Sequence, residues 1–427
     1  MNARVAACEL LVAVLDEGRP LDEALNGTAS FDALAGRDRA FARAMATATL
    51  RRLGGLDAVL AQFLDRPLPE TAAHGRAMLR IGAVQLLLMQ TPPHAAVGET
   101  VEAANALRKS AGFAKLINAV LRKVARDGAP LLAAQPPGAD LPTWLFTRWR
   151  ATYGEATAAA IAQALQTEAS LDVSVKDGAT EWARQLFGAV TPTGSVRLPE
   201  GGGVDQLAGF AEGEWWVQDA AAALPARLLG DVRGKTVLDL CAAPGGKTLQ
   251  LAAAGARVTA VDRSSERLER LRENLARTNL EATVVARDAL TLKIREPFDA
   301  VLLDAPCTST GTLRRHPDVA WLRRPSDVQT LAELQGRLLA HAATMVKPGG
   351  TLVYTVCSLE PEEGPAIAAQ ALKSDSWARA PIARGEIEGA DEFITPDGDL
   401  RTLPSHWSEI GGLDGFYALR LVRSSAG

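Results

Sequence analysis

The chain has few cysteines and no long apolar run, and each absence excludes a class of protein. Its 427 residues include four cysteines, without a C-x-x-C pair and without histidines at zinc-binding spacing. No apolar stretch approaches the roughly 18 residues of a membrane-spanning helix. Acids at Glu9, Asp16 and Glu17 argue against a signal peptide. We therefore expect a cytoplasmic protein with free thiols, no membrane association and no bound metal.

The charge of the chain is low overall but uneven. Hydrophobic residues make up 47% and charged residues 22%, as in soluble globular proteins, and the length predicts two or three domains. Residues 1–128 carry 16 Lys and Arg against 13 Asp and Glu, whereas the remainder carries 30 against 37. Six of these basic residues follow one another without an intervening acid: Arg108, Lys109, Lys115, Arg122, Lys123 and Arg126. Such a cluster favours phosphate contacts, although a solvated helix face is an equal alternative.

Residues 1–128 show the pattern of a helical bundle. Apolar residues recur every three or four positions from Val5 to Leu15 and from Leu79 to Leu88, as they do in helices with one buried face. The segments Leu79–Leu87, Pro92–Val101 and Lys115–Arg122 resemble the NusB-like RNA-binding domain. The resemblance implies that this all-α domain binds structured RNA.

Two shorter regions separate this bundle from the rest of the chain. Residues 129–143 are rich in proline, glycine and alanine, which predicts an interdomain linker. Residues 144–225 predict a small α+β region, with a long helix followed by short strands, that connects the domains and contributes to RNA binding.

Residues 226–427 alternate between strand and helix patterns. Alternation of this kind predicts a parallel, doubly wound α/β sheet of the Rossmann-like type, whose ligands bind at the carboxyl ends of the strands. The predicted strands are Thr236–Leu240, Arg257–Val261, Ala282–Ala286, Ala300–Leu303 and Thr351–Thr355.

A glycine-containing turn follows the first of these strands. Paired glycines let backbone amides approach a ligand closely. The turn is not a nucleotide-binding P-loop, because Cys241 stands where that motif requires glycine. Asp262 and Asp288 end the next two strands, where an acid accepts hydrogen bonds from a ribose or an adenine amine; each alone is also a common turn or cap residue. From the turn and the two strand-end acids we predict cofactor contacts at Ala243, Pro244, Gly245, Gly246, Asp262 and Asp288.

Two cysteines follow two other predicted strands. Cys307 comes three residues after Asp304, and Cys357 follows the last strand. Neighbouring parallel strands lie ~5 Å apart, so both thiols can reach one base. A thiolate that adds to carbon 6 of a pyrimidine activates carbon 5 toward a methyl group. Together with the glycine turn, this arrangement is expected of an enzyme that uses S-adenosylmethionine. The residue pattern alone leaves open which thiol attacks.

Nearly the whole chain resembles the NOL/NOP/Sun family of RNA 5-methylcytosine methyltransferases, and within it the bacterial RsmB (Sun) group. The matching motifs are Cys241–Lys247, Asp304–Cys307, Arg314–Asp318 with Trp321–Arg323, Cys357–Ser358 and Asp414–Ala418. The resemblance implies an S-adenosylmethionine-dependent enzyme that methylates carbon 5 of cytosine in RNA. It also implies further cofactor contacts from Cys241, Ala242, Lys247 and Asp304.

The resemblance also implies roles for single residues. Cys357 is the expected nucleophile and Cys307 the residue that helps release the product, although swapped roles stay open because other cytosine-5 methyltransferases attack through a Pro-Cys cysteine. Asp304 is expected to hold the base, and Lys247 to contact the cofactor or the base; a solvent-facing lysine is the alternative. The chain departs from many relatives at Val356, where they carry threonine.

The resemblance points to 16S rRNA, free or in assembling small subunits, as the partner. A buried carbon 6 must leave the base stack to be attacked, which favours single-stranded or loop RNA. We expect a monomer. Two alternatives remain: the same reaction on tRNA, and a noncatalytic ribosome-assembly factor that keeps a methyltransferase fold and binds RNA. Intact cysteine and glycine motifs argue against the second.

Overall fold

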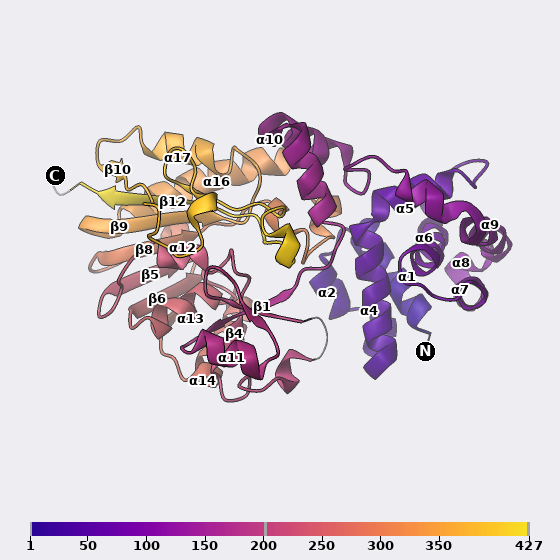
Figure 1. Ribbon diagram of the computed structural model, residues 1–427, viewed down its shortest axis with the longest axis horizontal. Coiled ribbons are helices and arrows are strands. Elements are labelled where there is room, and N and C mark those ends of the chain that lie inside the picture. The colour runs from indigo at the N-terminus through magenta and orange to yellow at the C-terminus, as the bar shows by residue number, and fades with distance from the viewer. Residues whose placement is uncertain (1, 200–202, 425–427) are drawn as a thin grey trace. The chain divides into compact units, whose positions relative to one another are not determined.

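The computed structural model describes residues 2–199 and 203–424 (Figure 1). It divides into two compact units. One holds the chain up to Thr167 together with Leu313–Arg324, and the other holds Glu168–Thr312 and the chain from Pro325 onward. The first unit is helical and the second contains both sheets, which confirms the predicted fold classes of the two ends of the chain.

The first unit is a bundle of helices with one apolar core. Its helices are α1 (Ala3–Leu15), α2 (Leu21–Leu25), α3 (Ala29–Asp32), α4 (Gly36–Arg51), α5 (Leu53–Ala61), α6 (Ala73–Leu87), α7 (Pro93–Ala106), α8 (Arg108–Ala111), α9 (Ala114–Ala133), α10 (Thr143–Ala164) and the short α15 (Val319–Leu322).

Helix α9 shows why these segments form a bundle. Ile117, Val120, Leu121 and Val124 recur at helical spacing, and each is at most 1% exposed. Gly82 of α6 lies against this face, since a Cβ there would come within 2.2 Å of Leu121 Cδ1. The missing side chain therefore lets α6 and α9 approach each other closely.

The helical unit extends further than residues 1–128. Helix α9 continues through Pro130 to Ala133, so the segment expected to be a linker, 129–143, begins inside a helix. Proline is tolerated there because it lies in the last turn, where it removes only one backbone hydrogen bond. Helix α10, expected in the α+β region, belongs to the first unit and breaks at Gly154, where φ is +80°.

A short segment from the carboxyl-terminal half of the sequence also belongs to the first unit. Within Leu313–Arg324, Asp318 Oδ2 accepts a hydrogen bond from Leu21 N at 2.9 Å, and Trp321 Nε1 donates to Leu50 O at 2.9 Å. We expected all of residues 226–427 to form one catalytic domain. The structure differs for this segment, because Asp318 and Trp321 form hydrogen bonds with α2 and α4 of the first unit.

The second unit begins with a small antiparallel sheet in the order β2-β3-β1-β4. Its elements are β1 (Leu171–Val175), α11 (Ala179–Gln185), β2 (Ala189–Val190), β3 (Val196–Leu198) and β4 (Trp215–Val217).

The large sheet has the order β10-β12-β9-β8-β5-β6-β7, with β11 paired to β12. Its strands are β5 (Thr236–Leu240), β6 (Arg257–Asp262), β7 (Thr283–Ala286), β8 (Phe298–Asp304), β9 (Val346–Val356), β10 (Trp377–Arg379), β11 (Leu400–Arg401) and β12 (Tyr417–Arg423). The five predicted strands pair in parallel, as expected. The edge formed by β10, β11 and β12 is antiparallel, so the sheet is mixed rather than wholly parallel.

Helices cover both faces of this sheet (Figure 1). Helices α16 (Pro325–Ala343) and α17 (Pro365–Ala371) pack on one face, and α12 (Leu224–Arg227) and α13 (Gly246–Ala253) pack on the other, with α14 (Ser265–Thr278) beside β6. The chain leaves β5 for β6 on one side and later adds β8 on the other. This reversal of strand order lies at the carboxyl ends of β5 and β8, the usual ligand position in such sheets.

Candidate active site

The turn between β5 and α13 carries few side chains at the carboxyl edge of the sheet. Cys241 has a φ of +60° and Gly245 a φ of +111°, and α13 begins at Gly246. A Cβ on Gly245 would lie 2.2 Å from Leu271 Cδ1. Backbone conformation and packing therefore both require glycine at this position.

Asp262, at the end of β6, is tied to this turn. The carboxylate is 5% exposed and accepts hydrogen bonds from Ala243 N at 3.2 Å and Ser264 N at 2.9 Å. Asp288 follows β7, is exposed, and accepts from Leu290 N at 2.8 Å as the cap of a short 3₁₀ helix. Both acids thus end successive strands as expected, and both also act as turn or cap residues.

Lys247 and Asp304 form an ion pair between the first turn of α13 and the end of β8. Lys247 Nζ lies 2.7 Å from Asp304 Oδ2, and the lysine side chain is only 11% exposed. Its ammonium also lies 5.2 Å from the centre of the Phe416 ring, a cation–π contact. The alternative of a solvent-facing lysine is therefore wrong.

The two strand-end cysteines meet. Cys307 Sγ lies 3.5 Å from Cys357 Sγ, although 50 residues separate them in the sequence. Strands β8 and β9 are adjacent and parallel, with Asp304 opposite Thr355, so their carboxyl ends bring the two loops side by side. Cys307 is 5% exposed and Cys357 is half-buried.

The hydrogen bond between the thiols separates their acidities. Accepting this bond from Cys307 lowers the pKa of Cys357, and nearby Ser309 and Lys247 act in the same direction, against burial and Asp304. The same hydrogen bond, followed by burial, raises the pKa of Cys307 well above that of an ordinary thiol. The thiolate of the pair therefore forms at Cys357.

Burial changes the proton affinity of three other groups near the turn. It favours the neutral amine of Lys247, but the attraction of Asp304 outweighs it and the pKa of Lys247 is raised. Burial raises the pKa of Asp239 to about 7, although Thr248 Oγ1 donates to its carboxylate at 2.5 Å. Burial likewise raises the pKa of Cys241 to about 12, so this cysteine carries no thiolate at neutral pH.

The sequence alone did not indicate one buried acid that lies next to the cysteines. The Glu363 carboxylate accepts hydrogen bonds from Thr308 and Ser358, the residues that directly follow Cys307 and Cys357. Glutamates in loops are common, and only an aligned set of relatives would distinguish this one. Phe416 was also not predicted as a site residue, although it lies in the matched segment near the carboxyl end.

The departure at Val356 affects packing rather than the site's polar contacts. Val356 is fully buried in the core of the sheet. Thr355, one position earlier, donates from Oγ1 to Tyr417 O at 2.9 Å and so holds β9 to β12. Successive residues of a strand point to opposite faces, so Thr355 does not replace a hydroxyl at position 356.

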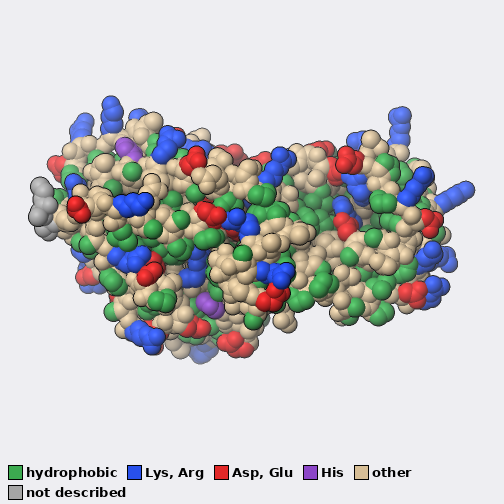
Figure 2. Space-filling view, turned by 90° about the horizontal axis from the view of Figure 1, so that it is seen from above, with side chains coloured by type: hydrophobic (Ala, Val, Ile, Leu, Met, Phe, Trp, Pro, Cys, Tyr) green, Lys and Arg blue, Asp and Glu red, His purple; other side chains and the backbone are tan. Residues whose placement is uncertain are grey.

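The predicted basic cluster lies on the surface of the first unit. All six of its residues, on α8 and α9, are exposed, and Arg126 is paired with Asp127 at 2.7 Å. Figure 2 shows Lys and Arg side chains gathered at the end of this unit on the right of the view. Exposed cations on adjacent helices are available to a phosphate backbone.

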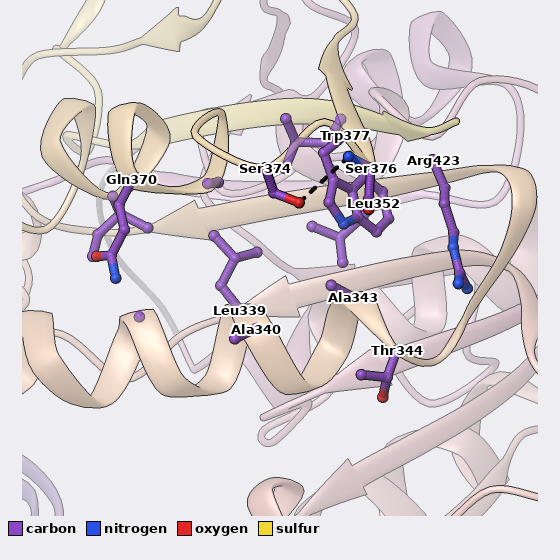
Figure 3. Close-up of a pocket in the computed structure, with 14 residues that line it drawn as sticks. Leu339, Ala340, Ala343, Thr344, Leu352, Gln370, Ser374, Ser376, Trp377 and Arg423 are labelled. Carbon is purple, nitrogen blue, oxygen red and sulfur yellow. Dashed lines mark hydrogen bonds between the residues drawn. The ribbon is translucent and has the colours of Figure 1, made fainter. Parts of the chain in front are cut away.

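A separate cavity of about 380 Å³ lies between α16, α17 and the strands (Figure 3). Leu339 and Ala343 line it from α16, and Leu352 and Trp377 from the sheet. None of the predicted site residues lines it. Over the described parts of the chain, no group of His, Cys, Asp and Glu is arranged to hold a metal, and no helix is long and apolar enough to cross a membrane.

The comparisons with known proteins cover both units. A model of the family described as 16S rRNA methyltransferase RsmB/F matches residues 226–422, and a model of the NusB family matches residues 1–126. Ribosomal RNA small subunit methyltransferase B of Xanthomonas campestris is 40% identical over 84% of each chain. The protein of the same name from Pseudomonas putida is 37% identical over 100% of this chain and 99% of its own.

A solved structure agrees with the fold. The crystal structure of a methyltransferase homolog protein from Pyrococcus horikoshii aligns with a TM-score of 0.56 and 26% identity, over 66% of this chain and 95% of that one. Since both ends of the sequence match family models and relatives at this identity align along most of its length, the chain belongs to the 16S rRNA methyltransferase RsmB/F family and carries a NusB-family domain.

Proposed function

We propose that this protein transfers a methyl group from S-adenosylmethionine to carbon 5 of a cytosine in 16S rRNA through a covalent bond between Cys357 and carbon 6. The observation that carries the proposal is the thiol pair at the ends of β8 and β9, with sulfurs 3.5 Å apart. The Lys247–Asp304 ion pair belongs to the same edge of the sheet. Membership of the family, and the ribosomal RNA named for its relatives, support the substrate.

The residues at the turn after β5 fit a nucleoside cofactor. The turn from Cys241 to Gly246 presents backbone rather than bulky side chains, and Asp262 beside it retains carboxylate lone pairs for ribose hydroxyls. Asp239 Oδ1, under the turn, is buried without a hydrogen-bond partner among the described residues. S-adenosylmethionine would supply an electrophilic methyl group on a sulfonium sulfur.

Cys357 carries the first chemical step of the proposal. Its thiolate adds to carbon 6 of the cytosine, and the electron pair of the carbon 5–carbon 6 double bond makes carbon 5 nucleophilic. The Asp304 carboxylate accepts a hydrogen bond from the exocyclic amine, and one from ring nitrogen 3 once that nitrogen has taken a proton from solvent as negative charge develops on it. Lys247 keeps the Asp304 carboxylate in place. Carbon 5 would then take the methyl group, and the electron pair of the broken methyl–sulfur bond would stay on the sulfur of the departing cofactor.

Cys307 serves the release step. In the methylated adduct the Cys307 sulfur, after releasing its own proton to solvent, takes the proton of carbon 5. The electron pair then re-forms the carbon 5–carbon 6 double bond, and the bond from carbon 6 to the Cys357 sulfur breaks. The short separation of the two sulfurs supports this division, because one base then lies within reach of both. The lowered pKa of Cys357 and the raised pKa of Cys307 support the same order of roles.

The helical domain, predicted as residues 1–128, would place the RNA. Its exposed basic cluster on α8 and α9 supports phosphate contacts. Unpaired cytosines in 16S rRNA, free or in assembling small subunits, are the proposed targets, and the protein is proposed to act as a monomer.

Incubation with methyl-labelled S-adenosylmethionine tests the function. Unmodified 16S rRNA, 30S particles and tRNA are compared, and the labelled base is identified after digestion. Label in 5-methylcytosine of 16S rRNA is expected, absent from Cys357→Ala and retained in Cys8→Ala, a matched change of a core cysteine in the first unit. Label on tRNA alone would overturn the substrate, and no label despite bound cofactor would favour the noncatalytic assembly factor.

A further inference from the structure

The loops that carry the two cysteines are tied to one buried carboxylate. Glu363 accepts hydrogen bonds from Thr308 N at 2.9 Å and Thr308 Oγ1 at 2.5 Å. It also accepts from Ser358 Oγ at 2.5 Å. Thr308 directly follows Cys307 and Ser358 directly follows Cys357, so a single side chain holds both loops at the residue next to each thiol.

Helix α16 reinforces this arrangement. Gln335 Nε2 donates to Glu363 Oε1 at 2.9 Å and to Pro306 O at 2.9 Å. Pro306 precedes Cys307, so the network holds that cysteine from both sides. Tyr354 of β9 donates from its hydroxyl to Glu363 O at 2.6 Å and fixes the backbone that bears the carboxylate.

Burying this carboxylate is costly. Glu363, Thr308, Ser358 and Gln335 are all fully buried. Desolvation raises the pKa of Glu363 despite the hydrogen bonds it accepts. Moving a carboxylate out of water is unfavourable, so stability alone does not account for a carboxylate here. Its hydrogen bonds do account for it, because they tie the two loops together at the residues next to the thiols. Further along, the loops are also joined by Gly311 N, which donates to Cys357 O at 3.0 Å, and by Leu359 N, which donates to Thr310 Oγ1 at 3.0 Å.

We propose that Glu363 is a positioning residue that sets the distance between the sulfurs of Cys307 and Cys357. The geometric part needs no substrate, while its consequence for catalysis rests on the proposed function. When the loops separate, Cys307 no longer donates to Cys357, and the Cys357 thiolate loses the hydrogen bond that stabilises it.

Thiol alkylation of the full-length protein, without cofactor or RNA, tests the geometry. The rate at which iodoacetamide modifies Cys357 is measured by mass spectrometry as a function of pH. The double variant Thr308→Val/Ser358→Ala removes both hydroxyl arms and leaves the Glu363 charge in place. In this variant we expect the pH at which the modification rate of Cys357 is half-maximal, the Cys357 midpoint, to rise by about one pH unit. The reason is that the Cys357 thiolate loses its hydrogen bond from Cys307. Thr308→Ser keeps the hydroxyl and should keep the wild-type midpoint.

The matched control is a carboxylate that ties the opposite ends of the same strands. Asp299, at the start of β8, accepts from Thr236 N at 2.8 Å and from Lys347 Nζ at 2.6 Å. Asp299→Asn should lower the melting temperature and leave the Cys357 midpoint unchanged. Glu363→Gln should raise the midpoint, and if that variant does not fold, the double variant supplies the same readout.

The outcomes separate this inference from the proposed function. A folded double variant with the wild-type midpoint overturns the positioning role, even if the wild-type enzyme makes 5-methylcytosine. A raised midpoint supports it, even if the wild type methylates no RNA. Where methylation occurs, kcat should fall at least about 10-fold in the double variant with little change in KM for RNA, since only the reacting groups are displaced.

Discussion

Cys307 Sγ and Cys357 Sγ lie 3.5 Å apart at the carboxyl ends of two adjacent parallel strands. The contact makes one thiol a hydrogen-bond donor and the other an acceptor, so the two cysteines are chemically different before any substrate binds. Their exchange for alanine should therefore have different effects.

We expect Cys307→Ala to form a protein–RNA adduct that survives a denaturing gel, because methyl transfer proceeds and release does not. Cys357→Ala should give neither adduct nor product. Each variant should unfold within about 1 kcal/mol of the wild type, since replacing a thiol with a methyl group removes little buried area. Adduct from Cys357→Ala together with an inactive, adduct-free Cys307→Ala would reverse the two roles.

Lys247→Met should lower the methylation rate by about 100-fold or more while leaving the protein folded. The change removes the cation 2.7 Å from Asp304 but keeps an apolar stem against Phe416. Initial rates at saturating cofactor and RNA, with circular dichroism as a check on folding, measure it. Lys235→Met, at an exposed lysine just before β5, serves as the control and should retain the wild-type rate. Equal methylation rates for the two variants would show that Lys247 takes no part in the reaction.

Gly245→Ala should destabilise the protein by about 1–3 kcal/mol and weaken cofactor binding. A side chain at a φ of +111° is strained, and its Cβ would overlap Leu271. Gly246→Ala is the matched neighbour, because its Cβ would meet Gln218 only at an ordinary 3.6 Å. Thermal unfolding with and without cofactor distinguishes the two. A melting temperature for Gly245→Ala equal to that of Gly246→Ala would contradict the requirement for glycine.

Asp239→Asn should make the protein less sensitive to pH. The pKa of Asp239 is raised from 3.8 to about 7 in the folded state, so the folded protein keeps a proton that the unfolded chain releases. This contribution to stability is fully present below about pH 4 and is lost as the pH rises through about 7. Between pH 5 and pH 8 the free energy of unfolding of the wild type should therefore fall by about 2 kcal/mol more than that of the variant. Urea titrations at both pH values measure the difference, and a constant difference would show an ordinary pKa.

Replacing Lys115, Arg122 and Lys123 with alanine should weaken RNA binding about equally for all sequences. Each lost phosphate contact should reduce the slope of log affinity against log salt by about 1. Filter binding across a salt series measures this slope. Lys373→Ala combined with Arg384→Ala, at exposed cations of the second unit, should leave the slope unchanged. An unchanged slope in the triple variant would show that the basic cluster is an ordinary solvated surface without phosphate contacts.

Local patterns were sufficient for the elements that build the site. The strand β5 has the predicted bounds Thr236–Leu240, and Gly245 lies in the turn that the paired glycines indicated. Cys307 and Cys357 follow strands β8 and β9 as expected. These features follow from apolar runs that end at glycine or polar residues, which a single sequence displays directly.

Local patterns were not sufficient for features that depend on distant partners. Helix α17 follows β9, so the alternation of strands and helices predicts that the next strand is parallel, whereas β12 pairs with β9 in the antiparallel direction. The segment Leu313–Arg324 reads as part of the catalytic domain, yet its hydrogen bonds run to Leu21 and Leu50. Neither result follows from the periodicity of the segment itself.

The sequence by itself determined the α/β sheet, the glycine turn and the thiols at strand ends, because each depends on residues close together along the chain. Only the tertiary structure decided that the thiols of Cys307 and Cys357 meet, that Asp304 neutralises Lys247, and that Glu363 holds both cysteine loops. These relationships join residues that lie far apart in sequence and depend on strand order. Strand order is set by the packing of the whole sheet and leaves no mark in local periodicity.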